Sequence, residues 1–263
     1  MNKSAKFYFY IFIMAQTINF MSYNMTGSDT IKTKWLRDIG KLCDSSFINI
    51  QEHFRKSKTV SKFFKDEFPS FNSYIIPGYR APGQDSGRPI AGLAQLSAKC
   101  YNIKKTRVKT ISPRIQAQIL QLTNSKLLWI NSYLPTDNGE NNIDELNEVL
   151  GEIENIADNS DFDDILWGAD MNWHKGRNTQ HCLTIERALD KLGLTSVWDK
   201  FDCDFTHIHT DNKSVSKIDH FMCNERLFNF IEQCSPIHSG DNFSRHSPIV
   251  HYYLSMTFLG VKL

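Results

Sequence analysis

Short hydrophobic runs, rich in β-branched and aromatic residues, recur along most of this chain and predict buried strands. Alternation of apolar and polar residues is clearest in the middle of the chain, where it favours antiparallel pairs. The expected strands lie at 17–24, 47–50, 74–76, 90–96, 108–111, 115–122, 127–133, 163–166, 217–222, 231–237 and 247–254.

Apolar residues at helical spacing predict helices between these runs, at 31–43, 59–68, 143–157 and 183–192. The segment 143–157 is the clearest, with apolar residues on one face and acids on the other. Gly27-Ser28-Asp29 predicts a turn and a helix cap before the first helix, and Pro69 ends the second. Strands and helices are mixed, without a visible repeat or linker, so one α+β domain over 17–255 is expected.

The first residues resemble a signal peptide, because two lysines precede the apolar run Phe7 to Ala15. Cleavage after Ala15 would place Ile13 at the −3 position, where a small residue is preferred. Met14 is an alternative start. We therefore expect 1–16 to be an N-terminal extension and not a signal peptide, and 256–263 to be a C-terminal tail.

Composition is that of an ordinary globular protein: 263 residues, 41% hydrophobic and 22% charged, with a net charge of only +1. The charge distribution says more. Six basic residues and no acids lie between Lys99 and Arg114, whereas eleven acids and no Lys or Arg lie between Asp137 and Asp164. Either one face attracts polyanions, or these are two unrelated solvated faces.

The six cysteines have no CxxC or other metal-ligand spacing, which indicates buried free thiols in a reducing compartment. An intracellular protein, nuclear or cytoplasmic, is therefore expected. No stretch is long enough to span a membrane, and nothing indicates an obligate protein partner. His207-x-His209 and His174 invite a zinc interpretation, but no further ligand cluster accompanies them, so we treat them as structural or substrate-contacting.

Gly168-Ala169-Asp170-Met171-Asn172 follows the apolar run at 163–166 and carries the first candidate chemistry. The strand is expected to stop at Gly168, with Asp170 and Asn172 just beyond it. Ligand sites of α/β sheets tend to lie outside the carboxyl ends of strands. Period two places both side chains on one side, where they could converge on a phosphate or a metal ion. The alternative is an Asx turn that caps the strand.

Other expected strand ends carry polar residues as well: Asn24, Glu52, Tyr133 and Asp219, with His246 just before the last strand. Each is ordinary by itself, since Asn favours turns and Glu is usually solvated. Their order along the chain is more informative than any single one.

That order resembles the endonuclease/exonuclease/phosphatase superfamily. The matching motifs are Asn24, Gln51-Glu52, Asn131-x-Tyr133, Gly168-x-Asp170-x-Asn172, Ser216-x-Ile218-Asp219 and Ser244-x-His246-x-Pro248. Gly87-Arg88-Pro89 with Gly92-Leu93-Ala94 is similar to a segment of the apurinic-endonuclease-like nuclease domain of non-LTR retrotransposons. The resemblance extends over about 17–255.

The resemblance implies a four-layer α/β/β/α sandwich of two packed mixed sheets. It also implies a DNA endonuclease that hydrolyses a phosphodiester with water activated by Mg²⁺, or by Mn²⁺ in its place. In such a site Glu52 and Asn24 would hold the metal, and Asp170 would orient or deprotonate the water. Asn172 and Tyr133 would contact the phosphate, and Asp219 would fix the tautomer of His246. Further substrate contacts are expected from Arg88, Asn131, Thr206 and Arg245.

The last motif departs from the family pattern, because Arg245 stands where the family usually has Asp. The change removes a potential metal ligand and is expected to disfavour protonation of His246. Arg245 contacts phosphate, or nearby Asp241 substitutes, or the chain is a decayed copy. Two other functions therefore stay open: a phosphatase for phosphorylated inositol or lipid in the same fold, and a catalytically impaired nucleic-acid-binding remnant.

Overall fold

The structure is a computed structural model and describes residues 18–80, 86–122, 124–138, 142–210 and 213–252. The extension predicted at 1–16 and the tail predicted at 256–263 lie outside these residues. The single domain expected over 17–255 therefore stays a prediction at its margins, whereas its interior can be compared with the structure directly.

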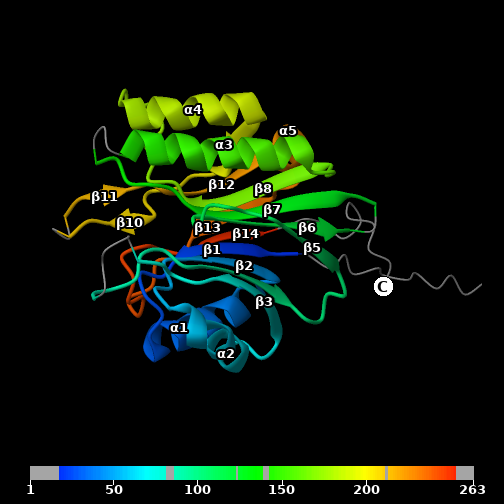
Figure 1. Ribbon diagram of the computed structural model, residues 1–263, viewed down its shortest axis with the longest axis vertical. Coiled ribbons are helices and arrows are strands. Elements are labelled where there is room, and N and C mark those ends of the chain that lie inside the picture. The colour runs from blue at the N-terminus through cyan, green and yellow to red at the C-terminus, as the bar shows by residue number, and fades with distance from the viewer. Residues whose placement is uncertain (1–17, 81–85, 123, 139–141, 211–212, 253–263) are drawn as a thin grey trace, which may run out of the picture.

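Two six-stranded sheets pack face to face (Figure 1). The strand order is β13-β14-β1-β2-β4-β3 in the first sheet and β5-β6-β7-β8-β12-β9 in the second. The strands of the first sheet are β1 Phe20–Asn24, β2 Phe47–Gln51, β3 Phe71–Ile76, β4 Leu93–Ala98, β13 Gln233–Pro236 and β14 Ile249–Tyr252. Those of the second are β5 Lys104–Val108, β6 Ile115–Gln121, β7 Lys126–Tyr133, β8 Asp164–Asp170, β9 Leu194–Ser196 and β12 Asp219–Asn224. Both sheets are mixed, because β1–β2 and β7–β8 are parallel while the other neighbours are antiparallel.

Helices cover the outer faces of the two sheets (Figure 1). Helices α1 Thr30–Leu42 and α2 Ser57–Glu67 pack on the first sheet, and α3 Ile143–Asn159 and α4 Gln180–Leu192 pack on the second. The short elements are α5 Glu225–Phe230, the 3₁₀ turn Val197–Asp199, and the two-stranded ribbon of β10 His207–Ile208 and β11 Val215–Ser216. The predicted four-layer sandwich is confirmed. None of the helices in the described ranges is long and apolar enough to cross a membrane.

The space between the sheets is apolar in one part and polar in another. Phe20, Phe47 and Trp129 belong to the apolar part. Elsewhere side-chain amides bridge the sheets: Asn49 Nδ2 donates to Ile130 O at 2.9 Å, and Gln51 Nε2 donates to Asn131 Oδ1 at 2.8 Å. Buried amides are costly unless bonded, so these pairs fix how one sheet sits on the other.

Some elements differ from the sequence prediction. The strand expected at 108–111 lies at Lys104–Val108 instead, because an edge strand with one face in water carries charges in place of an apolar run. Strand β8 does not stop at Gly168 but continues to Asp170. A Cβ on Gly168 would lie 2.7 Å from Phe221 Cε1 and 2.8 Å from Asn49 Nδ2, so this glycine permits close approach of neighbouring side chains within the strand.

Candidate active site

The carboxyl ends of the parallel pairs β1–β2 and β7–β8 bring the predicted polar residues to one edge of the sandwich. Asn24 and Asp170 are the last residues of β1 and β8, Tyr133 is the last of β7, and Glu52 follows β2. Asp219 begins β12 and does not end it, as the sequence had suggested. It still reaches this edge, because β12 runs antiparallel to β8 and pairs Asp219 with Asp170.

Asn24 lies at the centre of the group and is fully buried. Its Nδ2 donates to Glu52 Oε2 and to Asp170 Oδ2, both at 2.8 Å, and its Oδ1 accepts from the backbone N–H of Thr26 at 2.9 Å. In this conformation the Asn24 amide presents its hydrogens to two carboxylates and holds them in place. The expectation that Asn24 is a metal ligand stays a prediction.

His246 is buried between two carboxylates. Its Nδ1 lies 2.9 Å from Asp219 Oδ2, and its Nε2 lies 3.9 Å from Asp170 Oδ2. Burial alone lowers the pKa of His246, but the charges of Asp219 and Asp170 outweigh it and raise that pKa above its ordinary value. The imidazole is thus oriented by Asp219 and disposed to carry a proton, as the predicted role requires.

Burial also dominates the behaviour of Asp170. It raises the pKa of the Asp170 carboxyl well above its usual range, and the negative charges of Asp219 and Glu52 act in the same direction. The charge of His246 and the hydrogen bond from Asn24 oppose the rise. A carboxyl with a raised pKa is a better proton acceptor, which suits a general base.

Asn172 was expected either to form an Asx turn with Asp170 or to contact a phosphate or a metal ion. Its backbone N–H donates to Asp170 Oδ1 at 3.1 Å, which is the Asx turn. Its φ of +48° ends the extended conformation, so period two does not continue past Asp170. The Asn172 Nδ2 donates to Leu134 O at 2.9 Å, and an amide nitrogen has a second hydrogen. Contact between Asn172 and a phosphate stays a prediction.

The turn that carries Glu52 has a strained backbone and packs against the segment around Gly92. Glu52 and Phe54 have φ of +53° and +54°, in the left-handed region that costs most residues energy. Between them, His53 is buried against Gly92, where a Cβ would lie 2.6 Å from the imidazole. This contact explains the Gly92-Leu93-Ala94 motif. Arg88 of the same segment stacks its guanidinium 4.1 Å from the centre of the Phe54 ring and is exposed.

Tyr133 lies at the rim of the site, half-buried, with the Arg114 guanidinium 5.1 Å from its ring centre. Burial raises the pKa of its phenol strongly, and the charges of Glu52 and Asp170 raise it further. The phenol therefore keeps its proton at neutral pH and can act as a hydrogen-bond donor.

Two residues predicted to contact the substrate are buried. Asn131 is fully buried and donates through Nδ2 to Ile50 O and Gln116 Oε1. Thr206 is also fully buried, and its Oγ1 accepts from the backbone N–H groups of Ile218 and Asp219, both at 3.0 Å. Both side chains are engaged in hydrogen bonds within the fold, and their contact with a substrate stays a prediction. Burial is a tertiary property that the motif positions do not reveal.

The departure at Arg245 leaves the buried group intact, because the Arg245 side chain is exposed. Burial lowers the pKa of the neighbouring His207, and the charges of His246 and Arg245 lower it further. At His246 the lowering by burial is outweighed by the charges of Asp219 and Asp170, which raise its pKa. The effect of Arg245 on the protonation of His246 stays a prediction. The proposed substitute Asp241 is exposed on the same loop.

Sequence reasoning missed the residue that holds this loop, Asn242. Its Nδ2 donates to His246 O at 2.7 Å, and its Oδ1 accepts from the Tyr23 hydroxyl at 2.7 Å. The neighbouring Ser244 hydroxyl donates to Asn24 O at 2.8 Å. The only sequence signal was the proximity of Asn242 to the His246 motif.

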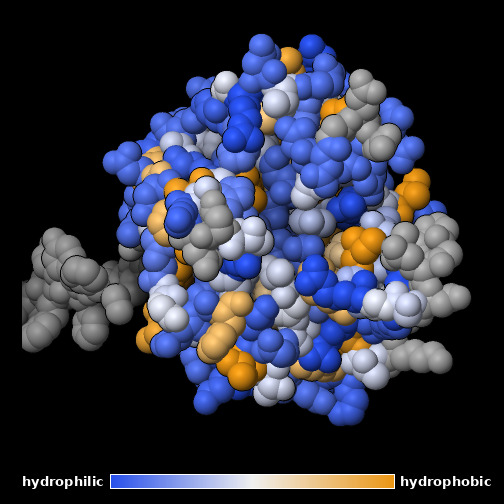
Figure 2. Space-filling view, turned by 90° about the vertical axis from the view of Figure 1, so that its left-hand side faces the viewer, coloured by the Kyte–Doolittle hydropathy of each residue, from blue (hydrophilic) through white to orange (hydrophobic). Residues whose placement is uncertain are grey.

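His207 and His209, for which the sequence analysis expected no zinc site, lie beside the candidate active site. The His207 ring lies 4.4 Å from the His246 ring and 4.8 Å from the His209 ring. Figure 2 looks onto the side of the molecule where β10 and β11 lie and shows a mainly hydrophilic surface. Among the described residues, the one group of His, Cys, Asp and Glu with metal-ligand spacing is Asp170, Asp219 and His246, which includes neither His207 nor His209.

The donor set fits a hard divalent cation. Ligand atoms of Asp170, Asp219 and His246 lie within 4.8 Å of one another, and Asn24 links Asp170 to the Glu52 carboxylate. Carboxylate oxygens are the ligands that Mg²⁺ and Mn²⁺ prefer. The mutual repulsion that raises the pKa of Asp170 is what a bound cation would relieve.

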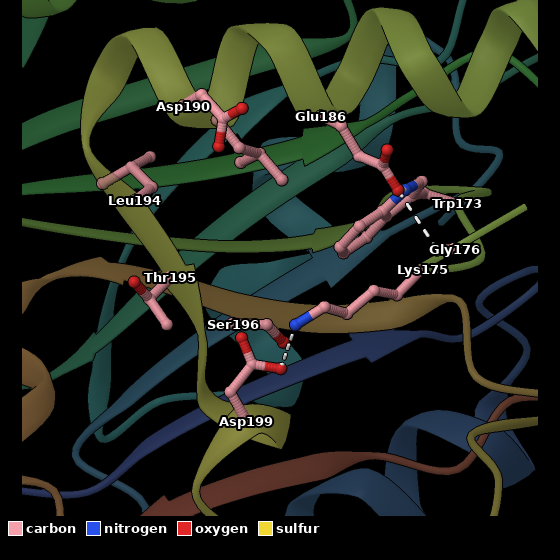
Figure 3. Close-up of a pocket in the computed structure, with 10 residues that line it drawn as sticks. Trp173, Lys175, Gly176, Glu186, Asp190, Leu194, Thr195, Ser196 and Asp199 are labelled. Carbon is pink, nitrogen blue, oxygen red and sulfur yellow. Dashed lines mark hydrogen bonds and ion pairs between the residues drawn. The ribbon is translucent and has the colours of Figure 1, made fainter.

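A separate cavity of about 410 Å³ lies between α4 and β9 (Figure 3). Three of its charged groups are paired: Lys175 Nζ lies 2.6 Å from Asp199 Oδ1, and Glu186 Oε1 accepts from Gly176 N at 3.2 Å. Glu186 also accepts from Trp173 Nε1 at 3.4 Å. These contacts fasten the segment that follows Asn172 onto α4.

Neither a protein-family model nor a curated protein sequence matches the chain. Solved structures do. The endonuclease domain of TRAS1, a telomere-specific non-LTR retrotransposon, superposes with a TM-score of 0.67 at 13% identity, covering 92% of this chain and 100% of that one. The AP endonuclease LMAP from Leishmania major gives 0.70 at 11% identity, with 90% and 87% covered. The 3′ phosphatase NExo from Neisseria, bound to a product DNA hairpin, gives 0.67 at 10% identity, with 89% and 98% covered.

At such identities the likeness establishes the fold. The chain has the endonuclease/exonuclease/phosphatase fold, shared with a retrotransposon endonuclease domain and with AP endonucleases, and the resemblance inferred from its motifs is confirmed at that level. The activity of this chain has to be argued from its own site.

Proposed function

We propose that this protein is a divalent-metal-dependent phosphodiesterase that nicks DNA, with Mg²⁺ as the resident ion and Mn²⁺ as a substitute. The observation that carries the proposal is the buried group Asp170, Asp219 and His246, linked through Asn24 to Glu52. Paired carboxylates beside an oriented imidazole suit hydrolysis, which needs one group to accept a proton and another to meet developing charge.

Each residue has a distinct part in the proposed reaction. Asp170 accepts the proton of the water that attacks phosphorus, while the bond to the leaving oxygen breaks. His246, held by Asp219, donates a hydrogen bond to a phosphoryl oxygen, and so do Tyr133 and the second N–H of Asn172. Glu52 would hold the cation, which would stabilise the negative charge that builds up on the phosphoryl group.

DNA is the proposed substrate, and exposed cations near the site support it. Arg88 is stacked on Phe54 beside the Glu52 turn, and Arg245 is displayed one residue before His246. Guanidinium groups bind phosphate through paired hydrogen bonds. The DNA hairpin product bound to the 3′ phosphatase of the same fold points the same way. An intracellular location, with all six cysteines as free thiols, is part of the proposal.

A plasmid-nicking assay tests the proposal. Wild type should nick supercoiled plasmid with Mg²⁺ or Mn²⁺ and not with EDTA, and Asp170→Asn and His246→Gln should each lose at least about 100-fold in rate. Asp158→Asn, at an exposed position of α3, is the matched control and should keep full activity. Equal nicking by all four proteins would reject the proposed site.

The same proteins separate the alternatives. Phosphate release from an inositol phosphate or lipid panel, without plasmid nicking, would identify a phosphatase. DNA binding without cleavage under either metal would identify a remnant. The hydrogen-bonded Asp219–His246 pair does not support the alternative of a catalytically impaired, nucleic-acid-binding protein.

A further inference from the structure

The outer strands β3 and β5 face each other across one side of the sandwich, and their inward positions are polar. Lys105 and Arg107 alternate with Val108, which packs towards the helical layer, so the two cations share the face that looks onto the first sheet. Arg107 places its guanidinium 4.5 Å from the ring centre of Tyr74 on β3. Inward positions of a sandwich are normally filled with apolar side chains.

A pocket of about 170 Å³ lies between these strands. Besides the two cations it is lined by side chains that can donate hydrogen bonds, and no carboxylate takes part. The lining residues are Asn72, Ser73, Tyr74, Gln95, Ser97, Lys105, Arg107 and Gln118.

The two cations differ from their neighbour on the same basic run. Arg114 forms an ion pair with Glu145, at 2.6 Å between Nε and Oε1. Within the described ranges, neither Lys105 nor Arg107 forms an ion pair. Lys105 is half-buried, and its burial lowers the pKa of the ammonium without a carboxylate to offset the effect. The unpaired, partly desolvated ammonium of Lys105 is costly unless an anion completes the site, whereas Arg107 is exposed.

We propose that this pocket between β3 and β5 binds a phosphate group. Lys105 supplies a point charge, and Arg107, oriented by its stacking on Tyr74, supplies a planar pair of donors. Serine and amide side chains around them complete the donor set. The phosphate comes either from a nucleic-acid backbone that extends from the catalytic edge along β5, or from a free phosphate compound. The first source rests on the proposed DNA substrate, and the second does not.

Inward-pointing charges also protect edge strands from pairing with other chains. Edge protection requires only the charges, whereas a phosphate site requires their position beside Tyr74. The two explanations therefore differ in what Lys105→Gln/Arg107→Gln should do compared with a variant that removes two charges elsewhere on the same run. Lys104→Gln/Lys109→Gln is that control, because both lysines are exposed and outside the pocket.

The first arm uses inorganic phosphate and NMR. Titration into the wild type and the control should shift the resonances of the Tyr74 ring and the Arg107 side chain saturably. In Lys105→Gln/Arg107→Gln the affinity should fall by about tenfold or more, since hydrogen bonds to charged groups are lost. Thermal unfolding verifies that each variant is folded. If the pocket variant does not fold, the titration of the wild type alone still tests whether phosphate binds beside Tyr74.

The second arm uses duplex DNA in EDTA, so that binding is measured without cleavage. If the phosphate is a backbone phosphate, the pocket variant should lower the slope of log affinity against log salt by about one per lost contact, and by more than the control does. Phosphate binding without this difference assigns the free compound. If neither phosphate nor DNA shifts the Tyr74 resonances, and both variants bind DNA equally, the proposal is overturned, whatever the nicking assay shows.

Discussion

His246 Nδ1 and Asp219 Oδ2 lie 2.9 Å apart in a buried pair, so the carboxylate decides which imidazole nitrogen carries hydrogen. Asp219→Asn replaces an obligatory acceptor with a group that can donate. We expect kcat for plasmid nicking to fall about 100- to 10,000-fold, with KM changed less than about threefold, because the tautomer is wrong while the binding surface stays.

A second His–Asp pair provides the control for this experiment. Asp204 Oδ1 lies 3.0 Å from His238 Nε2, on the surface. Asp204→Asn removes a similar contact and should leave kcat unchanged. Equal losses in the two variants would mean that the effect is general destabilisation and not the loss of tautomer control.

Gly168 is expected to tolerate no side chain. A Cβ there would lie 2.7 Å from Phe221 Cε1 and 2.8 Å from Asn49 Nδ2, both in packed surroundings. Gly168→Ala should lower the free energy of unfolding by about 1–3 kcal/mol in urea titrations, through overpacking. Gly151→Ala in α3, where a Cβ would meet nothing within 4 Å, should instead raise it by up to about 1 kcal/mol. Equal shifts of the urea midpoint in the two variants would refute this account.

Acid should protonate buried histidines at a cost in stability, in a pH range where the Asp170 carboxyl, with its pKa raised by burial to about 7, takes up a proton with the opposite effect. Burial lowers the pKa of His53, His220 and His251 to about 4 each. The unfolded state, with histidine pKa near about 6.5, binds more protons between these values. Stability contributed by the neutral imidazoles is therefore present above about pH 6.5 and lost as pH falls towards 4, on the order of 1–3 kcal/mol for each group.

Urea unfolding of Asp170→Asn at pH 7 and pH 5 measures this effect without the opposing titration of Asp170. Adding His251→Leu removes one of the buried imidazoles and should make the pH dependence smaller, since additivity holds for separated sites. An unchanged unfolding free energy between pH 7 and pH 5 in Asp170→Asn would show that these imidazoles do not resist protonation.

Arg245 is exposed beside the site, and its effect should be on binding. Arg245→Ala should raise KM for DNA about three- to tenfold with kcat unchanged, as expected for one phosphate contact made equally in ground and transition state. A gain of activity in Arg245→Asp would contradict this and favour the decayed copy.

The sequence predicted those parts of the site that depend on strand ends. Asn24, Glu52, Tyr133 and Asp170 were expected at strand ends, and the structure brings them together because β1–β2 and β7–β8 are parallel pairs. Asp219 was assigned to the wrong end of its strand, yet it reaches the same edge because β12 is antiparallel to β8. Motif order is thus a sound guide to location and a weaker one to strand direction.

The sequence did not predict which polar side chains are buried or where the edge strand β5 lies. Asn131 and Thr206 occupy motif positions but face inward, where their hydrogen bonds support the site. Strand β5 was displaced in the prediction because its residues are basic and lack apolar alternation. Periodicity reports which positions are apolar, and it does not report which polar positions are enclosed by the fold.

The hydrogen bond from Ser244 to Asn24 joins residues 220 positions apart, and Tyr23 and Asn242 are joined across 219. Contacts of such separation form late, since the entropy of closing a long loop is lost before they can stabilise the chain. After dilution from denaturant, strands and helices should therefore return before the catalytic group is complete. The rate at which nicking activity recovers then reports the rate at which β1 and β14 pair in the first sheet.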